Sequence, residues 1–277
     1  TRDGLNARTI QQLIAEKSAA TAPFFLALGL HKPHLPWTAP QRFFDLYPEG
    51  SIRAPADPAM HDIPAIALQT ELSGFAQPDS REGAIRAYYA CISFIDAQLG
   101  LVLDELDRRD LTRNTLIVFF SDHGFHLGDH GGLWAKLSAF DLSTRVPLLL
   151  AGPGVPEGHT VSAPVELIDV YPTLVDLARF AAPGGLQGKS LRPLLTDPDV
   201  PGYAYSLVYH YDVAGKRDRA GRTVIGSQWR YTEWDGAAAD RDTGTGGGGP
   251  GGCSRCRGGR GGESSGRRRR SIGAGDD

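Results

Sequence analysis

Apolar and polar positions along the chain follow two different periods. Apolar residues recur at helical spacing in three stretches, residues 5–19, 83–107 and 166–181. Three other stretches are unbroken apolar runs, residues 24–30, 116–120 and 146–151. The first pattern predicts helices, and the second is typical of strands covered on both faces. Because helices and strands alternate along the sequence, we expect an α/β sandwich.

The rest of the chain divides by composition. Residues 38–80 are rich in Pro, Asp and Ala, which predicts an irregular excursion over the sheet. Residues 203–211 and 223–231 are β-rich and flank a charged, glycine-containing turn at 215–221, which predicts a small antiparallel unit. From Gly236 to Asp277, Gly, Arg, Ser and Asp dominate, and such a segment cannot bury enough surface to offset its ordering entropy. We therefore expect three parts: a main domain over 1–200, a C-terminal antiparallel subdomain over 201–235 and a disordered Gly/Arg-rich tail over 236–277.

Composition narrows the class of protein further. The 277 residues are 41% apolar, which is ordinary for a globular chain with a core. The longest apolar runs are far shorter than the roughly 20 residues that cross a bilayer, so no membrane span is expected. The net charge is −3; after Gly236 eight Arg outnumber five Asp plus Glu, a surplus of +3 that leaves −6 for the body. A mildly acidic body gives no electrostatic case for nucleic acid binding.

The sequence leaves compartment and oligomeric state open. Its first residues are amphipathic rather than a signal peptide, and we expect a fragment that lacks its N-terminal part. Periplasmic, secreted and lysosomal settings are all compatible with it. Three cysteines give no disulfide framework: Cys91 falls in a helical pattern and is expected in the core. Cys253 and Cys256 form a lone C-x-x-C without a second ligand pair, so no zinc site is expected.

Candidate chemistry gathers where two of the apolar runs end. The run at 116–120 stops at Asp122-His123-Gly124, and open α/β sheets place ligands at the carboxyl ends of their strands. Asp122 and His123 could coordinate a cation, and Lys136, farther along the same glycine-rich loop, could hold an anion. The run at 24–30 also ends in a polar cluster, at residues 31–34. Two strands that end in His-rich loops suggest one shared site at the sheet edge, but from the residues alone a solvated loop, stiffened by Pro33 and Pro36, is the favoured interpretation of residues 31–34.

Three separated blocks of the sequence resemble one known family. SDHGFHLGDHGGLWAK, at 121–136, is similar to the second signature region of the type I sulfatases of the alkaline phosphatase superfamily. PFFLALGLHKPHLPWTAPQRFFDLYP precedes it, and FDLSTRVPLLLAGPGV and VELIDVYPTLVDLA follow it in the family's order. Together the blocks cover most of residues 1–200. The likeness is greatest to the iduronate-2-sulfatase-like members and their bacterial relatives.

The resemblance implies both a fold and an activity. The fold is an alkaline-phosphatase-like sandwich with a central, mostly parallel sheet, and residues 1–200 would be part of a sulfatase catalytic domain. The activity is that of a sulfuric ester hydrolase, which cleaves sulfate esters with the help of a metal ion. The expected substrate is a sulfated small molecule or glycan, with a sulfated sugar favoured by the likeness to iduronate-2-sulfatase.

The resemblance also assigns roles to individual residues. Asp122 and His123 match metal positions, and the implied ion is Ca²⁺, a hard cation suited to carboxylate oxygens. Lys136 matches the lysine that contacts the sulfate group, and His34 matches the histidine that assists the leaving oxygen. Lys32 is a weaker candidate for substrate contact. The other ligand-type residues of the loop are given supporting roles only: His126, Asp129 and His130.

Parts of the family pattern are missing from the sequence. The family's nucleophile is a formylglycine made from Cys or Ser in a C/S-x-P-S-R motif, and no such run occurs here. The family's N-terminal aspartate pair, which supplies further metal ligands, is absent too. We therefore expect this chain to be inactive, or nearly so, alone. A closing tyrosine-aspartate stretch and helix are also missing, and our hypothesis is a reading-frame shift near Gly236.

Two other functions remain open from the residues alone. Phosphate and phosphonate ester hydrolases of the same superfamily share the Asp-His-Gly strand end. A non-catalytic fragment that only binds sulfated glycans would carry the same motifs without turnover. The His-Lys-Pro-His block and the Leu-Trp-Ala-Lys ending favour the sulfatase over the phosphate and phosphonate ester hydrolases.

Overall fold

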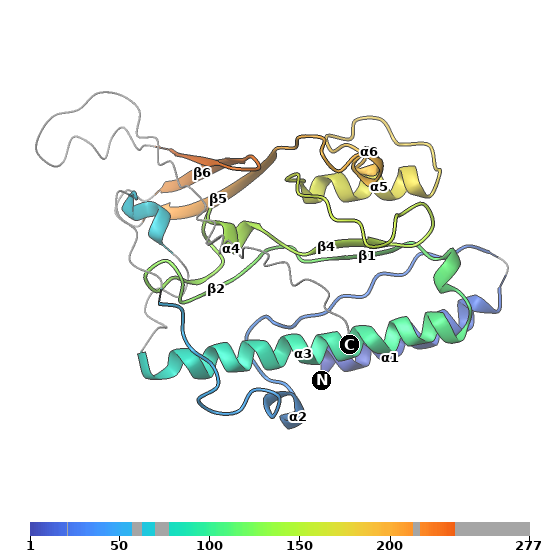
Figure 1. The fold of residues 1–277 in the computed structure, drawn as a ribbon, viewed down its shortest axis with the longest axis horizontal. Coiled ribbons are helices and arrows are strands. Elements are labelled where there is room, and N and C mark those ends of the chain that lie inside the picture. The colour runs from blue at the N-terminus through green and yellow to red at the C-terminus, as the bar shows by residue number, and fades with distance from the viewer. Residues whose placement is uncertain (21, 57–62, 70–77, 213–216, 236–277) are drawn as a thin grey trace, which may run out of the picture.

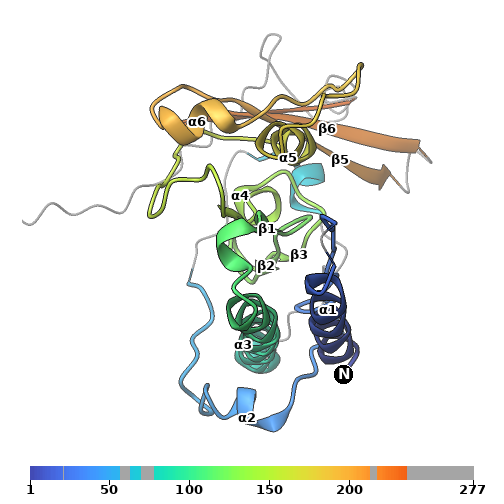
Figure 2. The same cartoon turned by 90° about the vertical axis from the view of Figure 1, so that its right-hand side faces the viewer.

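The computed structural model describes residues 1–20, 22–56, 63–69, 78–212 and 217–235. Its elements lie in tiers (Figure 1): helices α1 (Arg2–Ser18) and α3 (Pro78–Arg108) form one tier, the pair β1 (Ile117–Phe120) and β4 (Leu148–Ala151) the next, and helix α5 (Val170–Leu177) the last. Figure 2 shows the same order from the end, with α1 and α3 side by side. The remaining elements connect or flank these tiers: α2 (Gln41–Phe44), η1 (Ala65–Leu68), η2 (Thr112–Asn114), β2 (His126–Leu127), β3 (Trp134–Ala135), α4 (Asp141–Thr144), η3 (Leu167–Asp169), α6 (Arg192–Thr196), β5 (Ala204–Asp212), β6 (Arg217–Ile225) and β7 (Arg230–Trp234).

The two long helices form where the periodicity predicts them, and they pack on each other. The Thr1 hydroxyl caps α1 by accepting a hydrogen bond from the Gly4 amide (3.3 Å). Their shared core consists of Ala7, Ile10, Ile14, Val102 and Leu106. Ile92 and Leu103 belong to the apolar periodicity of α3 but are exposed. This helix carries apolar residues on more than one face, and spacing alone does not say which face is covered.

The strand predicted over 24–30 is not a strand among the described residues. The segment is extended, and its side chains alternate between half-buried and exposed. Leu26 and Leu28 pack against the core between α1 and α3, whereas Phe25 is 83% exposed. The Asn6 amide donates to the Gly29 carbonyl (2.9 Å). A strand needs a partner as well as a pattern, and no described residue forms a ladder with this segment.

The central strand pair corrects the expected sheet direction. β1 and β4 pair antiparallel, with Ile117 opposite Ala151 and Phe120 opposite Leu148. All other strand pairs in the described part of the chain are antiparallel too, so it contains no mostly parallel sheet. The strands are also only half covered: Leu149 is 57% exposed. An apolar run predicts a strand, but it fixes neither the direction of its neighbour nor what covers its second face.

A three-stranded antiparallel sheet, ordered β5-β6-β7, follows α6. Two strands were expected; the second, over 223–231, covers the end of one observed strand and the start of another. The predicted turn at 215–221 is largely strand β6 from Arg217 onward. Val208 and Trp234 pack on Ala139 and Phe140, which joins this sheet to the loop after β3.

Three further expectations concern cysteines, tail and membrane. Cys91 is fully buried in α3, as its helical position predicts. The tail 236–277, with Cys253 and Cys256, lies outside the described residues. Among the residues that are described, no helix is both long and apolar enough to cross a bilayer.

The helix predicted over 166–181 is shorter than expected and begins as the 3₁₀ turn η3 before α5.

The inner face of the C-terminal sheet carries a buried histidine. The His210 ring stacks on Trp234, with ring centroids 5.2 Å apart, and burial lowers the pKa of His210 from its ordinary value of 6.5. The unfolded chain therefore binds this proton more readily than the folded chain. The stabilisation is complete above the ordinary pKa and is lost as the pH falls toward the lower folded pKa.

We predict that His210→Phe flattens the acid side of the stability profile. Phenylalanine keeps the stacked ring and has no proton to bind, so the midpoint of thermal unfolding should fall less than in the original chain between neutral pH and about pH 5. Intrinsic tryptophan fluorescence during thermal unfolding measures this midpoint, and His159→Phe, at an exposed histidine, is the control. Equal pH dependence in the original chain and His210→Phe would contradict the assignment.

Candidate functional site

The loop after β1 holds Asp122 and His123 in a chelating arrangement. The His123 Nδ1 donates to the Gly124 carbonyl oxygen (2.7 Å), which leaves Nε2 with its lone pair. That Nε2 lies 3.6 Å from the Asp122 Oδ2, and the Asp122 side chain is 83% exposed. The His123 amide donates to the other carboxylate oxygen (3.1 Å) and fixes the carboxylate. One imidazole nitrogen and one carboxylate oxygen therefore face the same point in solvent.

This pair fits two positions of a metal coordination sphere. Nitrogen and oxygen donors at this separation can both reach one divalent cation, and the backbone bond to Nδ1 sets the tautomer that a metal requires. No group of three His, Cys, Asp or Glu with metal-binding geometry occurs within the described residues. Calcium takes six to eight ligands and zinc takes four. The two donors could therefore supply only part of such a coordination sphere.

The next residues form a hairpin that carries Lys136. Strands β2 and β3 pair His126 with Ala135 and Leu127 with Trp134. Inside the turn, the Gly132 and Leu133 amides both donate to the Asp129 carbonyl (3.0 and 2.8 Å). Lys136 follows directly, partly exposed, and its carbonyl accepts the Ser138 amide (2.8 Å).

The Asp129 carboxylate lies inside this hairpin and is almost fully buried. Burial favours its neutral form, but hydrogen bonds from the His126 ring and the Leu127 amide outweigh it, and the pKa of Asp129 is lowered. The sequence suggested supporting roles for His126, Asp129 and His130. The structure brings all three together, with the His126 and His130 ring centroids 5.8 Å apart.

The segment at 31–34 is held by an acid from helix α1. The buried Asp3 accepts the His31 amide on Oδ1 (2.8 Å) and the Lys32 amide on Oδ2 (3.1 Å). The Lys32 ammonium group donates a hydrogen bond to the Pro36 carbonyl. The exposed His34 donates from Nδ1 to the Leu35 carbonyl (2.9 Å), so its Nε2 is left for solvent or substrate.

An aromatic cluster brings these loops together. Trp37, whose Nε1 donates to the Pro33 carbonyl (2.9 Å), packs edge-on against Phe125 with centroids 5.9 Å apart. It also lies 6.4 Å from the Trp134 ring and 6.1 Å from Tyr88 of α3. Burial, with a smaller contribution from Cys91, raises the pKa of Tyr88 to about 12. The cluster touches the segment after His34, the residue two after His123 and the residue two before Lys136, so the three loops meet.

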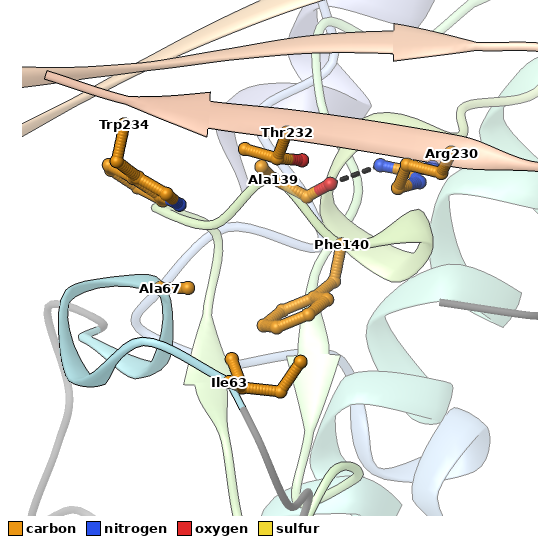
Figure 3. Close-up of a pocket in the computed structure, with 7 residues that line it drawn as sticks. All are labelled: Ile63, Ala67, Ala139, Phe140, Arg230, Thr232 and Trp234. Atoms are coloured by element: carbon orange, nitrogen blue, oxygen red, sulfur yellow. Dashed lines mark hydrogen bonds between the residues drawn. The ribbon is translucent and has the colours of Figure 1, made fainter. Parts of the chain in front are cut away.

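The C-terminal sheet supports the same loop from the other side. Arg230 of β7 donates to the Ala139 carbonyl, to the Thr144 hydroxyl (3.0 Å) and to Asp141 (2.9 Å). Figure 3 shows this contact beside a cavity of ≈ 20 Å³, lined by Ile63, Ala67, Ala139, Phe140, Arg230, Thr232 and Trp234. That volume accommodates about one water molecule, so the cavity is a packing feature and not a substrate pocket.

Sequence reasoning missed the residues that hold the loops. Asp3 stands in the first turn of a helix, where an acid is ordinary, and nothing in the pattern links it to His31. Ser138 and Arg230 likewise carry no local signal. The role of Trp37 in the aromatic cluster could be found only from its contact with Phe125.

The comparisons with known proteins agree with the early resemblance. A family model described as Sulfatase matches residues 3–180. A sulfatase of Formosa agariphila is 42% identical over 180 residues, which cover 61% of this chain and 35% of that protein. Human iduronate 2-sulfatase is 30% identical, over 83% of this chain and 55% of its own length. The chain thus spans about a third to just over half of these curated relatives.

Solved structures agree on the fold. A phosphonate monoester hydrolase from Silicibacter pomeroyi is 26% identical with a TM-score of 0.69, over 83% of this chain and 51% of that one. A protein solved in complex with its substrate D-glucosamine-2-N,6-O-disulfate has a TM-score of 0.65 at 19% identity, over 85% of this chain and 64% of that one. These neighbours establish an α/β fold of the alkaline-phosphatase-like kind for the part of the chain that they cover.

We predict that Asp3→Asn loosens the segment that carries His34. Asparagine keeps one acceptor oxygen but turns an amide N–H₂ toward the other backbone donor, so one N–H of His31 or Lys32 is left unsatisfied. The free energy of unfolding should fall by about 1–3 kcal/mol. Hydrogen exchange at both amides should accelerate, and NMR measures it. Asp45→Asn, at an exposed acid bonded to Gln41, is the matched control. Unchanged hydrogen exchange in folded Asp3→Asn would contradict the proposed role of Asp3 in holding this segment.

Proposed function

The chain belongs to the sulfatase family, and from that premise we propose that it forms part of a sulfuric ester hydrolase. The observation that carries the proposal is the convergence of three loops on Trp37. One loop presents Asp122 and His123, one presents His34, and one presents Lys136. Cation ligands, an imidazole and an ammonium group are the groups that hydrolysis of an anionic ester needs in one place.

Each of these residues has a role that its environment supports. Lys136, partly exposed at the end of the hairpin, is a point charge that binds an oxygen of the sulfate group. The Nδ1 of His34 donates to a backbone carbonyl, so Nε2 faces outward, and in the imidazolium form Nε2 also carries a proton, which it hands to the leaving oxygen. The Lys32 ammonium group is already hydrogen-bonded to the Pro36 carbonyl and so helps to fix the conformation of this segment. Lys32 is therefore the weaker candidate for substrate contact.

Asp122 and His123 would hold a divalent cation, which we propose to be calcium. When bound, such an ion neutralises charge on the ester's oxygens. The carboxylate is a hard oxygen donor suited to calcium, whereas the imidazole is also a common ligand of zinc. The two side chains contribute a fixed pair of donors, 3.6 Å apart, to a coordination sphere that needs further ligands.

The nucleophile of the reaction is not among these 277 residues. The family uses a formylglycine in a C/S-x-P-S-R motif, and the sequence contains no such run. We therefore propose that this chain contributes the second half of the site and has little or no turnover alone. The groups that remain bind, orient and protonate the ester, and they leave the attack on sulfur to the missing motif.

The proposed substrate is a sulfated sugar. Human iduronate 2-sulfatase is named for a sulfated sugar acid, and one structural neighbour was solved with a disulfated glucosamine. A second candidate function is hydrolysis of phosphonate monoesters. It is favoured by one observation, the similarity to a phosphonate monoester hydrolase with a TM-score of 0.69. The sequence relatives are sulfatases, so sulfate esters remain the primary proposal.

We predict that the chain binds a divalent cation weakly at Asp122 and His123. With two protein ligands the dissociation constant should be on the order of millimolar, as in the weakest calcium modules. Paramagnetic Mn²⁺ should broaden the NMR signals of residues 121–124 first, and excess Ca²⁺ should restore them. Asp122→Asn should abolish the effect, whereas Asp110→Asn, at an exposed acid paired with Arg113, should not. If the Mn²⁺ broadening is unchanged in Asp122→Asn, the cation binds elsewhere.

We predict that residues 1–277 alone do not turn over 4-nitrophenyl sulfate. A longer gene product that contains this chain together with a C/S-x-P-S-R motif should hydrolyse it, and Lys136→Ala should lower its kcat/KM by about 10²-fold, the loss typical of one group that stabilises transition-state charge. A phosphonate monoester assayed in parallel separates the two candidate functions. Faster phosphonate hydrolysis would favour the second, and sulfate-ester turnover by residues 1–277 would refute the half-site.

A further inference from the structure

A chain of buried hydrogen bonds runs through the hairpin that carries Lys136. The His126 ring is fully buried, and its Nδ1 donates to the Asp129 carboxylate. Its Nε2 lies 2.7 Å from the Ser138 hydroxyl oxygen, which is hydrogen-bonded in turn to the Ser143 hydroxyl (2.9 Å). The four side chains come from strand β2, the turn of the hairpin, the loop after β3 and helix α4.

The same residues also connect the two parts of the candidate site, which are the loop with Asp122 and His123 and the hairpin with Lys136. The Gly124 amide, directly after His123, donates to the Ser143 carbonyl (2.8 Å). The contact is close: a Cβ at Gly124 would lie 2.0 Å from the Leu142 carbonyl oxygen. Ser143 thus touches the metal-ligand loop through its backbone and the hairpin through its hydroxyl. Lys136 lies between the cross-strand partner of His126 and Ser138.

The backbone beside Lys136 is in a conformation that the surroundings must enforce. Ala135, directly before it, has φ +73°, and His130 has φ +49°, both in the left-handed region that side chains disfavour. Each conformation is costly and persists only when neighbouring contacts hold it. Ala135 lies opposite His126 in the β2–β3 pair, so the buried histidine stands directly across from the strained residue.

The network is better suited to fixing geometry than to raising stability. Replacing a buried His–Asp pair by apolar side chains of similar volume is often neutral for folding, whereas removing one partner leaves the other unsatisfied. A nucleophilic Ser–His–Asp triad is excluded by access, because Ser138 is only 3% exposed. What the arrangement can do is allow one conformation of the hairpin and penalise the others.

We propose that His126 is a positioning residue that sets the place of Lys136 relative to Asp122 and His123. It acts through Ser138 and Ser143 and touches neither substrate nor metal. The functional meaning of this role rests on the proposed anion-binding role of Lys136. The positioning itself is a statement about the hairpin, and it can be measured without turnover.

The test is competitive lysine labelling of the full 277-residue chain with acetic anhydride, read by peptide mass spectrometry. In His126→Ala, Lys136 should become more reactive by roughly fivefold, because loss of one net hydrogen bond shifts local opening by that factor. Lys17 and Lys189, which lie in other parts of the fold, should keep their rates. His126→Gln can still reach Ser138 and should rescue part of the effect. His159→Ala, at an exposed histidine near Leu194, is the matched control.

A double-mutant cycle sharpens the result. Ser138→Ala should reproduce the labelling change of His126→Ala, and the double variant should add little, because both break one chain. If His126→Ala does not fold, Ser138→Ala and His126→Gln carry the test. An unchanged Lys136 rate in a folded variant, or an equal rise at every lysine, would overturn the proposal. Because labelling needs no turnover, its outcome is separate from that of the sulfate-ester assay.

Discussion

The packing of Trp37 is the contact on which the candidate site depends. Its indole N–H is tied to Pro33, and its ring meets Phe125 and Trp134 from two other loops. Aromatic rings bury large areas and prefer defined edge-on geometries, so one such residue can fix the relative place of several backbones. Through Trp37, the segment that carries His34 contacts the loops that carry His123 and Lys136.

The fold could be predicted from sequence where the signal is local. Helices α1 and α3 form as expected, because helical spacing and capping act within a few residues. Two features were not predictable in the same way: the antiparallel pairing of β1 with β4, and the fact that no described residue forms a ladder with 24–30. Both depend on which neighbour is present, and an apolar run such as that around Leu149 states only that its faces favour burial.

The candidate site, too, was predictable where the signal is local and not where it depends on residues far apart in the sequence. The motif around Asp122 and His123 predicts cation binding from sequence alone, because open α/β sheets place ligands at the carboxyl ends of their strands. Which nitrogen of His123 is available depends on the local backbone conformation, since Nδ1 donates to the carbonyl of the next residue, Gly124. The aspartates that hold the loops were harder to predict. Asp3, for example, is 28 residues away from His31, whose amide donates to it.

Three buried aspartates share one way of holding loops. Asp3 accepts the amides of His31 and Lys32, Asp129 accepts Leu127 together with the His126 ring, and Asp169 accepts the amides of Glu166 and Lys189. A carboxylate offers several lone pairs and forms stronger bonds than a neutral acceptor, so one buried acid can satisfy two backbone donors that no strand satisfies. Because the central strand pair is only half covered, rigidity near its ends comes from such point contacts. Loops held in this way lose their geometry one residue at a time, which makes single substitutions at buried acids more informative than changes in the strands.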